Sequence, residues 1–371
     1  MRGPAYAASD VTIMGVTVLD STLAGCILAC VDANVPAGYR ALVSQGDGER
    51  PYVRVDRLAS AELPDHPVTV RVEASSLNYK DALAAAGRPG VMRRYPGTPG
   101  IDAAGTVLAS RDERWRPGDA VIVTSFDLGM GTPGGFAELI RVPGDWPTAM
   151  PAPWAPADAM AFGTAGLTAA LALLRLRAHG LDPAAGPVAV TGAAGGVGTC
   201  AVALLSQQGF EVIAVSGRSE TEDERLRALG ASQLWTRQRL AEGADRPLRR
   251  ADLAGAVDAV GGAPLAHLLA RVRRDGVVAA AGTVAGTALA TSVFPFVLRG
   301  VALLGIDSAE AAPGSRAAAW ALLAESGVLT RLRQSLHDVD LDGVEPWLAA
   351  LLESRVSGRV RVLLPPSGAA A

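Results

Sequence analysis

The chain has 371 residues, a formal net charge of −3 and 49% hydrophobic residues. This length suffices for two domains with their own cores, and the mixed, nearly balanced charge excludes a strongly basic nucleic-acid surface and indicates no binding to acidic membranes. The three cysteines (Cys26, Cys30, Cys200) and the four scattered histidines form neither a disulfide framework nor a zinc-ligand set, so we expect a cytoplasmic protein without a metal site.

The first 39 residues are predicted to be an N-terminal extension. Val11–Val31 is apolar, but Asp20 and several Ser, Thr and Gly residues interrupt it, so it falls short of the about 20 apolar residues of a membrane span. Leu23–Cys26 resembles a lipoprotein cleavage box, yet Arg2 is the only early cation, which disfavours export. We expect a poorly ordered segment, or an artefact of the chosen start codon.

Short strand-like runs separated by turn residues predict a mostly β domain up to about Pro151. These runs are Ala41–Val43, Tyr52–Val55, Val68–Val72 and Ala120–Thr124. Helices and strands then alternate to about Ile306, which predicts a parallel sheet. The alternating elements outside the glycine-rich region are helix Ala157–His179 and strands Ala256–Val260, Gly276–Ala280 and Val301–Gly305. The chain closes with helices Ser315–Ala324 and Val344–Ser354 and strand Arg359–Leu364.

The stretch Val188–Arg218 carries the strongest functional signal. Strand Val188–Val190, a glycine-rich turn, helix Thr199–Gln208 and strand Glu211–Val215 form the βαβ unit that binds a dinucleotide. The glycines permit a tight turn close to the pyrophosphate, and free amides at the helix N-terminus bind its charge. The spacing is GxxGxxG rather than GxGxxG, and a turn without ligand is the alternative. The turn residues expected to bind the cofactor are Ala194, Gly195, Gly196, Val197 and Gly198.

The end of the second strand favours NADPH over NADH. An NAD site has an acidic residue about 20 residues after the glycine turn, which binds the ribose 2′-hydroxyl. Here the strand ends in Ser216, Gly217 and Arg218, with no acid at its tip. Because a guanidinium makes two charge-assisted hydrogen bonds to a phosphate, Arg218 suits the 2′-phosphate of NADPH.

A β domain, an inserted dinucleotide domain and a C-terminal return are the layout of the medium-chain dehydrogenase/reductase superfamily. Within it, the chain resembles the acrylyl-CoA reductases and related NADPH-dependent quinone oxidoreductase-like proteins. The matching blocks lie between about Arg40 and Leu364 and are SSLNYKDALAAAG from Ser75, YPGTPGIDAAGTV from Tyr95, GTAGLTAALAL from Gly163, TGAAGGVG from Thr191, SGR from Ser216, VDAVGG from Val257, FPFVLRGVALLGIDS from Phe294 and SGRVRV from Ser357.

The resemblance implies an α/β protein with two domains. A GroES-like, mostly β catalytic domain is expected over residues 40–157 and 307–371, and a Rossmann domain with a doubly wound parallel sheet over 158–306. Zinc alcohol dehydrogenases of the superfamily carry Gly-His-Glu where this chain has Gly100-Ile101-Asp102. Cys and His are also missing at the other zinc-ligand positions, so we expect metal-free hydride transfer to a polarised double bond.

Such a reduction needs donors near the carbonyl oxygen and a proton for the α-carbon. Tyr79 is the candidate for lining the nicotinamide and donating to substrate or a proton relay; the alternative is an ordinary packed tyrosine. Asn78 is the candidate for donating an amide hydrogen to the carbonyl, with a turn role as the alternative. Lys80 and Asp81 are expected to pair with each other or with solvent.

The remaining site residues follow from the resemblance. Thr164 resembles the threonine near the nicotinamide ribose, and Gly261 and Thr283 follow later strands of the sheet. Arg237 and Arg359 are expected at the adenosine phosphate end and near the cofactor, with solvated surface charges as the alternative. Two further residues, Arg93 and Arg94, are candidates for binding the phosphates of a CoA substrate. The alternative is that both are solvated surface charges without a ligand.

Three functions stay open. The first is an NADPH-dependent reductase of acrylyl-CoA or a similar short enoyl thioester. The second is an NADPH quinone or enone reductase, and the third is a non-catalytic NADPH-binding protein. A homodimer is also predicted, because the resemblance places the apolar run Phe294–Ile306 as a strand at the sheet edge, paired with its twin, and Arg299 near the rim.

Overall fold

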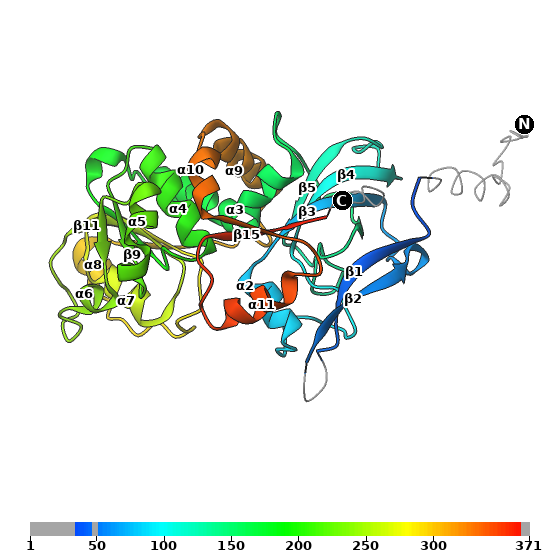
Figure 1. The fold of residues 1–371 in the computed structure, drawn as a ribbon. Coiled ribbons are helices and arrows are strands. Elements are labelled where there is room, and N and C mark those ends of the chain that lie inside the picture. Colours follow the sequence, from blue (N-terminus) through cyan, green and yellow to red (C-terminus); the bar gives the residue numbers. More distant parts are fainter. Residues whose placement is uncertain (1–33, 47–50, 365–371) are drawn as a thin grey trace, which may run out of the picture.

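The computed structural model describes residues 34–46 and 51–364, which form a β-rich lobe and an α/β lobe with helix α3 between them (Figure 1). Most of the predicted extension lies outside the described residues. The first strand begins at Gly38, and Tyr39 is buried in the core. The folded part therefore starts slightly before the predicted boundary after residue 39.

The β-rich lobe, the catalytic domain, contains a hairpin and a seven-stranded sheet. The hairpin joins β1 (Gly38–Ser44) and β2 (Val53–Ala59). The sheet has the order β14-β15-β3-β4-β5-β7, and β6 pairs with β3. Its strands are β3 (Val68–Ser76), β4 (Asp102–Ser110), β5 (Ala120–Thr124), β6 (Leu139–Val142), β7 (Thr148–Ala149), β14 (Leu336–Val339) and β15 (Arg359–Leu363). The helices of this lobe are η1 (Ser60–Glu62), α2 (Tyr79–Ala85) and α11 (Val344–Leu352).

The α/β lobe, the cofactor domain, contains a six-stranded parallel sheet in the order β10-β9-β8-β11-β12-β13. The order runs outward on both sides of β8, which is the doubly wound arrangement predicted from the sequence. Its strands are β8 (Val188–Thr191), β9 (Val212–Val215), β10 (Gln233–Trp235), β11 (Leu253–Asp258), β12 (Val272–Ala280) and β13 (Ala302–Gly305). The helices between them are η2 (Pro183–Ala185), α4 (Gly196–Gln207), α5 (Ser219–Ala228), α6 (Arg237–Ala241), α7 (Gly262–Leu269) and α8 (Phe294–Arg299).

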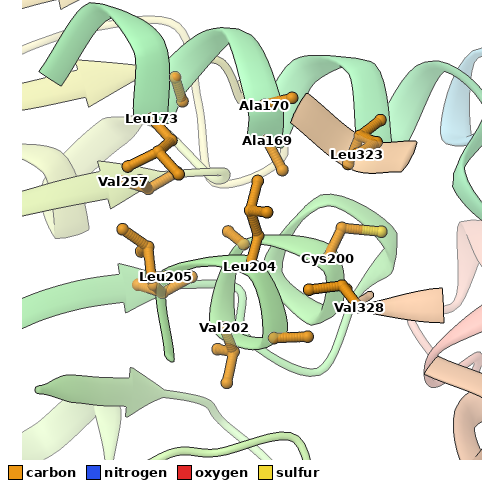
Figure 2. Close-up of a cluster of buried hydrophobic side chains, with 14 of the residues drawn as sticks. Ala169, Ala170, Leu173, Cys200, Val202, Leu204, Leu205, Val257, Leu323 and Val328 are labelled. Carbon is orange, nitrogen blue, oxygen red and sulfur yellow. The ribbon is translucent and has the colours of Figure 1, made fainter. Parts of the chain in front are cut away.

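The largest buried cluster joins helices on one face of this sheet. Figure 2 shows Ala169, Ala170 and Leu173 of α3 (Pro156–Ala178) against Leu204 and Leu205 of α4, with further residues from β11 and the C-terminal part. Helix α3 is the one described helix long and apolar enough to cross a membrane, but 83% of that stretch is buried inside the protein. It is therefore a core helix of this fold.

The C-terminal helices correct the predicted domain boundary. Residues from 307 onward were expected in the catalytic domain, yet α9 (Pro313–Glu325) packs against α3, and α10 (Leu329–Leu332) against α4. Trp320 and Leu323 are buried in the same cluster as α4. The chain rejoins the catalytic sheet only after η3 (Arg333–Ser335), at β14.

The sequence indicated a single strand over the apolar run Phe294–Ile306, and this expectation is wrong. The first half of this run forms α8, with Pro295 in the first turn and Gly300 in the left-handed region (φ 64°) after the last turn. Proline at a helix start and glycine just past its end are typical helix boundaries. The second half forms β13, which does lie at the edge of the sheet.

Candidate active site

The glycine-rich turn lies between β8 and α4. Gly192 has a left-handed backbone (φ 61°), and a Cβ on Gly198 would collide with the main chain of Gly192 and Ala193. A Cβ on Gly195 would meet only the carbonyl oxygen of Gly192, at 3.4 Å, so this side of the turn is open. Helix α4 begins at Gly196, three residues before its predicted start, so Gly196, Val197 and Gly198 present the unpaired first amides of the helix.

Two arginines predicted at the adenosine phosphate meet at the tip of β9: Arg218 follows this strand, and Arg237 is the first residue of α6, after β10. Arg218 Nη2 donates to the carbonyl oxygen of Val356 at 3.0 Å, and the Ser216 hydroxyl accepts from the Arg218 amide at 3.0 Å. The guanidinium of Arg237 covers Gly217, where a Cβ would lie 2.6 Å from Arg237 Cζ. The structure therefore brings Ser216, Gly217, Arg218 and Arg237 together at the end of β9.

Gly261 and Thr283 also meet at the carboxyl ends of their strands. A Cβ on Gly261 would lie 3.3 Å from Thr283 Cα. The Gly261 amide donates to buried Asp258 at 2.7 Å, and Thr191 donates to the same carboxyl at 2.6 Å. Burial raises the pKa of Asp258 above its ordinary value. This carboxyl group fixes the loop after β11 relative to the end of β8.

On the catalytic domain, Asn78 and Tyr79 lie at the start of α2. The Asn78 amide group donates to Asp102 Oδ2 at 2.7 Å and to the carbonyl oxygen of Ser76 at 3.2 Å, so its donors are engaged within the protein. Asn78 also caps α2, which is the turn role weighed as its alternative. The side chain of Tyr79 is exposed to 37% and available to a ligand.

The sequence analysis expected Asp81 to pair with Lys80 or with solvent, and the structure shows a different environment. Asp81 is fully buried, and its carboxyl accepts from the amides of Asn78 and Ile101, both at 2.8 Å. Burial, followed by the nearby Asp102 carboxylate, raises the pKa of Asp81 to about 7. Asp81 thus joins the start of α2 to the segment that precedes β4.

Thr164 on α3 lies beside two polar side chains of the catalytic domain. Its hydroxyl donates to Asp102 Oδ1 at 2.6 Å and is 2.8 Å from the Ser125 hydroxyl. Ser125 has a left-handed backbone (φ 64°), a conformation that costs of order 1–3 kcal/mol and gathers at functional sites. Thr164 and Asn78, which come from different elements, are thereby held by one carboxylate.

Arg359 and the CoA candidates occupy different environments. Arg359 is only 2% exposed and lies under the glycine-rich turn, where a Cβ on Gly196 would be 2.9 Å from its Nη1. It therefore supports the turn from below instead of being a surface charge. Arg93 is exposed and pairs with Asp127 at 3.0 Å, and Arg94 is exposed. Neither arginine is placed by a contact with another predicted site residue.

Several polar residues of the site were not singled out by the sequence analysis. Asp102 is one, although an acid flanked by Ile101 and Ala103 is the pattern of a buried carboxylate that must find partners. Arg225 is another: it donates to the carbonyl oxygen of Ala194 at 3.3 Å and to Glu222 at 2.6 Å. Arg316, also buried, donates to Thr124 and stacks its guanidinium 4.3 Å from the Phe126 ring.

Over the residues that the structure describes, no group of three or more His, Cys, Asp or Glu side chains is arranged to hold a metal ion. The polar groups of the site, from Asp81, Asp102 and Asp258 to Thr164, are instead bound to protein donors or acceptors. The site thus consists of an open glycine-rich turn and of loops and helix starts that buried carboxyl groups hold together by hydrogen bonds.

Comparisons with known proteins agree with this arrangement. Residues 64–153 match the family described as alcohol dehydrogenase GroES-like domain. The chain is 44% identical to acrylyl-CoA reductase AcuI of Ruegeria pomeroyi, over 87% of this chain and 98% of that protein. It is similar to the crystal structure of the YhdH oxidoreductase of Salmonella enterica in complex with NADP (TM-score 0.84, 42% identity, 88% of this chain and 99% of that chain). It is also similar to Bacillus subtilis YhfP with NAD bound (TM-score 0.85, 40% identity, 89% and 100%).

Proposed function

Because the chain belongs to the acrylyl-CoA reductase family of the medium-chain dehydrogenase/reductase superfamily, we propose that it is an NADPH-dependent reductase of acrylyl-CoA or a similar short enoyl thioester. The observation that carries the proposal is the joint geometry of the open glycine-rich turn and the two arginines at the tip of β9. NADPH matches both features, because its pyrophosphate fits the turn and its 2′-phosphate fits the arginines.

The residues present fit NADPH. The side of Gly195 that a Cβ would fill is open, and the first amides of α4 can bind a pyrophosphate there. Arg218 follows Ser216 and Gly217 directly and the Arg237 guanidinium lies over Gly217, so a 2′-phosphate at this point would receive charge-assisted hydrogen bonds. When bound, NADPH supplies the hydride that reduces the carbon–carbon double bond of the substrate.

The protein's part in the reaction is orientation and proton supply. Thr164, expected near the nicotinamide ribose, and Asn78, expected near the substrate carbonyl, are both fixed by Asp102, so this wall of the site is rigid before the cofactor binds. The exposed hydroxyl of Tyr79 is the group we assign to the thioester side, where it can donate a hydrogen bond or pass on the proton for the α-carbon. Arg93 and Arg94 remain candidates for the CoA phosphates.

One experiment separates the three candidate functions. NADPH oxidation is followed with acrylyl-CoA, crotonyl-CoA and a simple quinone side by side, with equal enzyme in each assay. Faster turnover of the thioesters supports the proposal, and faster turnover of the quinone supports the alternative reductase. Binding of NADPH without turnover of any acceptor would leave only a nucleotide-binding protein. Replacement of Tyr79 by Phe in the active assay then tests the assigned hydroxyl.

The proposed assembly is a homodimer formed through the edge of the cofactor sheet. In the described part of the chain, six of the eight exposed large hydrophobic side chains lie between residues 284 and 298, next to β13, and they are Val284, Leu289, Val293, Phe294, Val297 and Leu298. Contiguous exposed apolar surface beside an unpaired edge strand is typical of a protein interface. Arg299, expected near the rim of this interface, donates to the carbonyl oxygens of Ala270 and Val272 and so fixes the end of α8.

A cytoplasmic location is also part of the proposal. It is supported by Cys200, whose thiol is buried in the cofactor domain and forms no disulfide. Fractionation of cells that express the full chain tests this location, with activity in the membrane or exported fraction as the contrary result.

A further inference from the structure

We propose that Asp102 is a positioning residue for hydride transfer: at a break in α3 it holds Thr164, assigned to the nicotinamide, together with Asn78, assigned to the substrate side. The inference rests on the proposed function, which makes these two assignments. Asp102 lies at the first position of β4, in the catalytic domain, whereas α3 runs on into the cofactor domain. A carboxylate at this point can therefore fix one domain relative to the other.

The break is local and is built around Gly163. This residue has φ 52° and ψ −153°, so α3 stops and restarts within one continuous helical segment. A Cβ at Gly163 would collide with Ser76 Oγ and with Asp102 Oδ2, so only glycine lets the helix approach the catalytic sheet this closely. The restart exposes the amide of Thr164, which has lost its place in a continuous helix.

Asp102 takes up that amide together with three further donors. Oδ2 accepts from the Thr164 amide at 2.9 Å, from Asn78 Nδ2 at 2.7 Å and from Ser76 Oγ at 2.6 Å, and Oδ1 accepts from Thr164 Oγ1 at 2.6 Å. The side chain is buried, so these donors replace water as the stabilisers of its charge. An ionised carboxylate has two acceptor oxygens with about four lone-pair sites, so it can accept all four hydrogen bonds, whereas an amide or hydroxyl cannot.

Arg359 holds the other side of the break. Its Nε donates to the carbonyl oxygen of Ala161, just before Gly163, at 3.3 Å. Its Nη2 donates at 2.7 Å to Ser76 Oγ, which itself donates to Asp102. A Cβ on Gly196 would lie 2.9 Å from Arg359 Nη1, so the same guanidinium lies under the glycine-rich turn.

Asp102, Ser76 and Arg359 thus form a buried chain of contacts from Thr164 and Asn78 to the glycine-rich turn. We call these three residues the clasp. Because hydride transfer falls steeply with small errors in the placement of the reactants, loosening the clasp should slow the chemical step more than it weakens substrate binding. This pattern differs from that of a residue needed only for folding, which changes the amount of active enzyme.

The test compares Asp102→Asn and Ser76→Ala with the wild type. Asparagine keeps one acceptor oxygen, but its NH2 group cannot accept a hydrogen bond, so at least one of the four donors loses its acceptor and the negative charge of the group is removed. Ser76→Ala removes the hydroxyl that links Asp102 to Arg359. We expect Asp102→Asn to lower kcat by about tenfold or more, with a smaller change in KM, and Ser76→Ala to lower it less. The primary isotope effect with NADPH deuterated at the transferred hydrogen should rise in both, because chemistry becomes more rate-limiting.

Asp252→Asn is the matched control. It replaces a different carboxylate, partly buried, which binds Arg271 at 2.9 Å within the cofactor domain and away from the clasp. It should lower thermal stability while leaving the isotope effect unchanged. All rates are normalised to the folded fraction from circular dichroism, and Ser76→Ala decides the outcome if Asp102→Asn does not fold.

Two results would overturn the inference. One is a rate per folded enzyme within about twofold of wild type, with an unchanged isotope effect, in the variants that fold. The other is an increase in KM alone, which would mean that the clasp affects only binding. Failure of the proposed function is distinguishable, because it is read from the wild type: an enzyme that reduces a quinone but no enoyl-CoA refutes the function, while the clasp is still measured with the quinone.

Discussion

Arg218 Nη2 donates to the carbonyl oxygen of Val356 at 3.0 Å, which binds the tip of β9 to the segment that leads back into the catalytic domain. The contact fixes one arm of the guanidinium. Since a guanidinium has five N–H donors, others remain for a phosphate. The side chain proposed to select NADPH is therefore oriented by a main-chain contact before the cofactor arrives, which lowers the entropy lost on binding.

Arg218→Ala should reduce the preference for NADPH over NADH. Loss of charge-assisted hydrogen bonds to the 2′-phosphate should cost about 1.5–3 kcal/mol, roughly 10- to 150-fold in the ratio of kcat/KM values. The measurement is kcat/KM for both cofactors with one acceptor. Arg227→Ala, which breaks an exposed ion pair with Asp223 on the same helix, is the control and should leave the ratio unchanged. An unchanged ratio in Arg218→Ala would refute the assignment.

Asp81 should make the stability of the protein depend on pH. Its pKa is raised from 3.8 to about 7, so the folded state binds a proton more tightly than the unfolded state. The contribution is fully present below pH 3.8 and is lost as the pH rises through about 7, with a slope of at most about 1.4 kcal/mol per pH unit. We expect Asp81→Asn to remove this slope from denaturant unfolding curves. Equal slopes in the two proteins between these pH values would contradict it.

Activity should not require a metal ion. The chain has Ile101 and Asp102 where zinc alcohol dehydrogenases carry His and Glu, and the described residues contain no cluster of ligand side chains. Prolonged EDTA treatment followed by gel filtration should therefore leave kcat unchanged. A loss of activity that added zinc restores, and magnesium does not, would show that the prediction is wrong.

The dimer should depend on the apolar surface next to β13. Val297 of α8 belongs to this surface and is 68% exposed, so Val297→Glu places a charge in the proposed interface at little cost to the folded monomer. Light scattering at micromolar concentration should show a dimer for wild type and a monomer for this variant. Tyr52→Glu, at a 50% exposed site on the other domain, is the control and should remain dimeric. A fully active wild-type monomer would count decisively against the proposal.

Local sequence patterns were sufficient to predict the cofactor domain. The βαβ unit from Val188 to Val215 has strand, glycine turn, helix and strand within 28 consecutive residues, so short-range turn and helix chemistry defines it. The predicted helix boundaries were less accurate where one residue belongs to both a turn and a helix. Gly196 is both a turn glycine and the first residue of α4, and glycine lowers the helical signal of the sequence.

The apolar run after residue 293 shows a different limit. Short apolar segments are compatible with either a strand or a buried helix, and periodicity does not distinguish them. Pro295 and Gly300 mark the helix only once their backbone angles are known. The packing of α9 against α3 was likewise decided by which surface covers Trp320, and this is a property of the packed fold.

The sequence by itself determined the α/β class, the dinucleotide turn and the arginines at the tip of β9, because each depends on residues close together in the chain. The tertiary structure alone decided the role of Asp102 and Arg359. Ser76 and Arg359 are 283 positions apart, yet they share a hydrogen bond at the break of α3. The partners of Asp102 and Arg359 come from segments far apart in the chain, so water satisfies these charges until the fold has assembled.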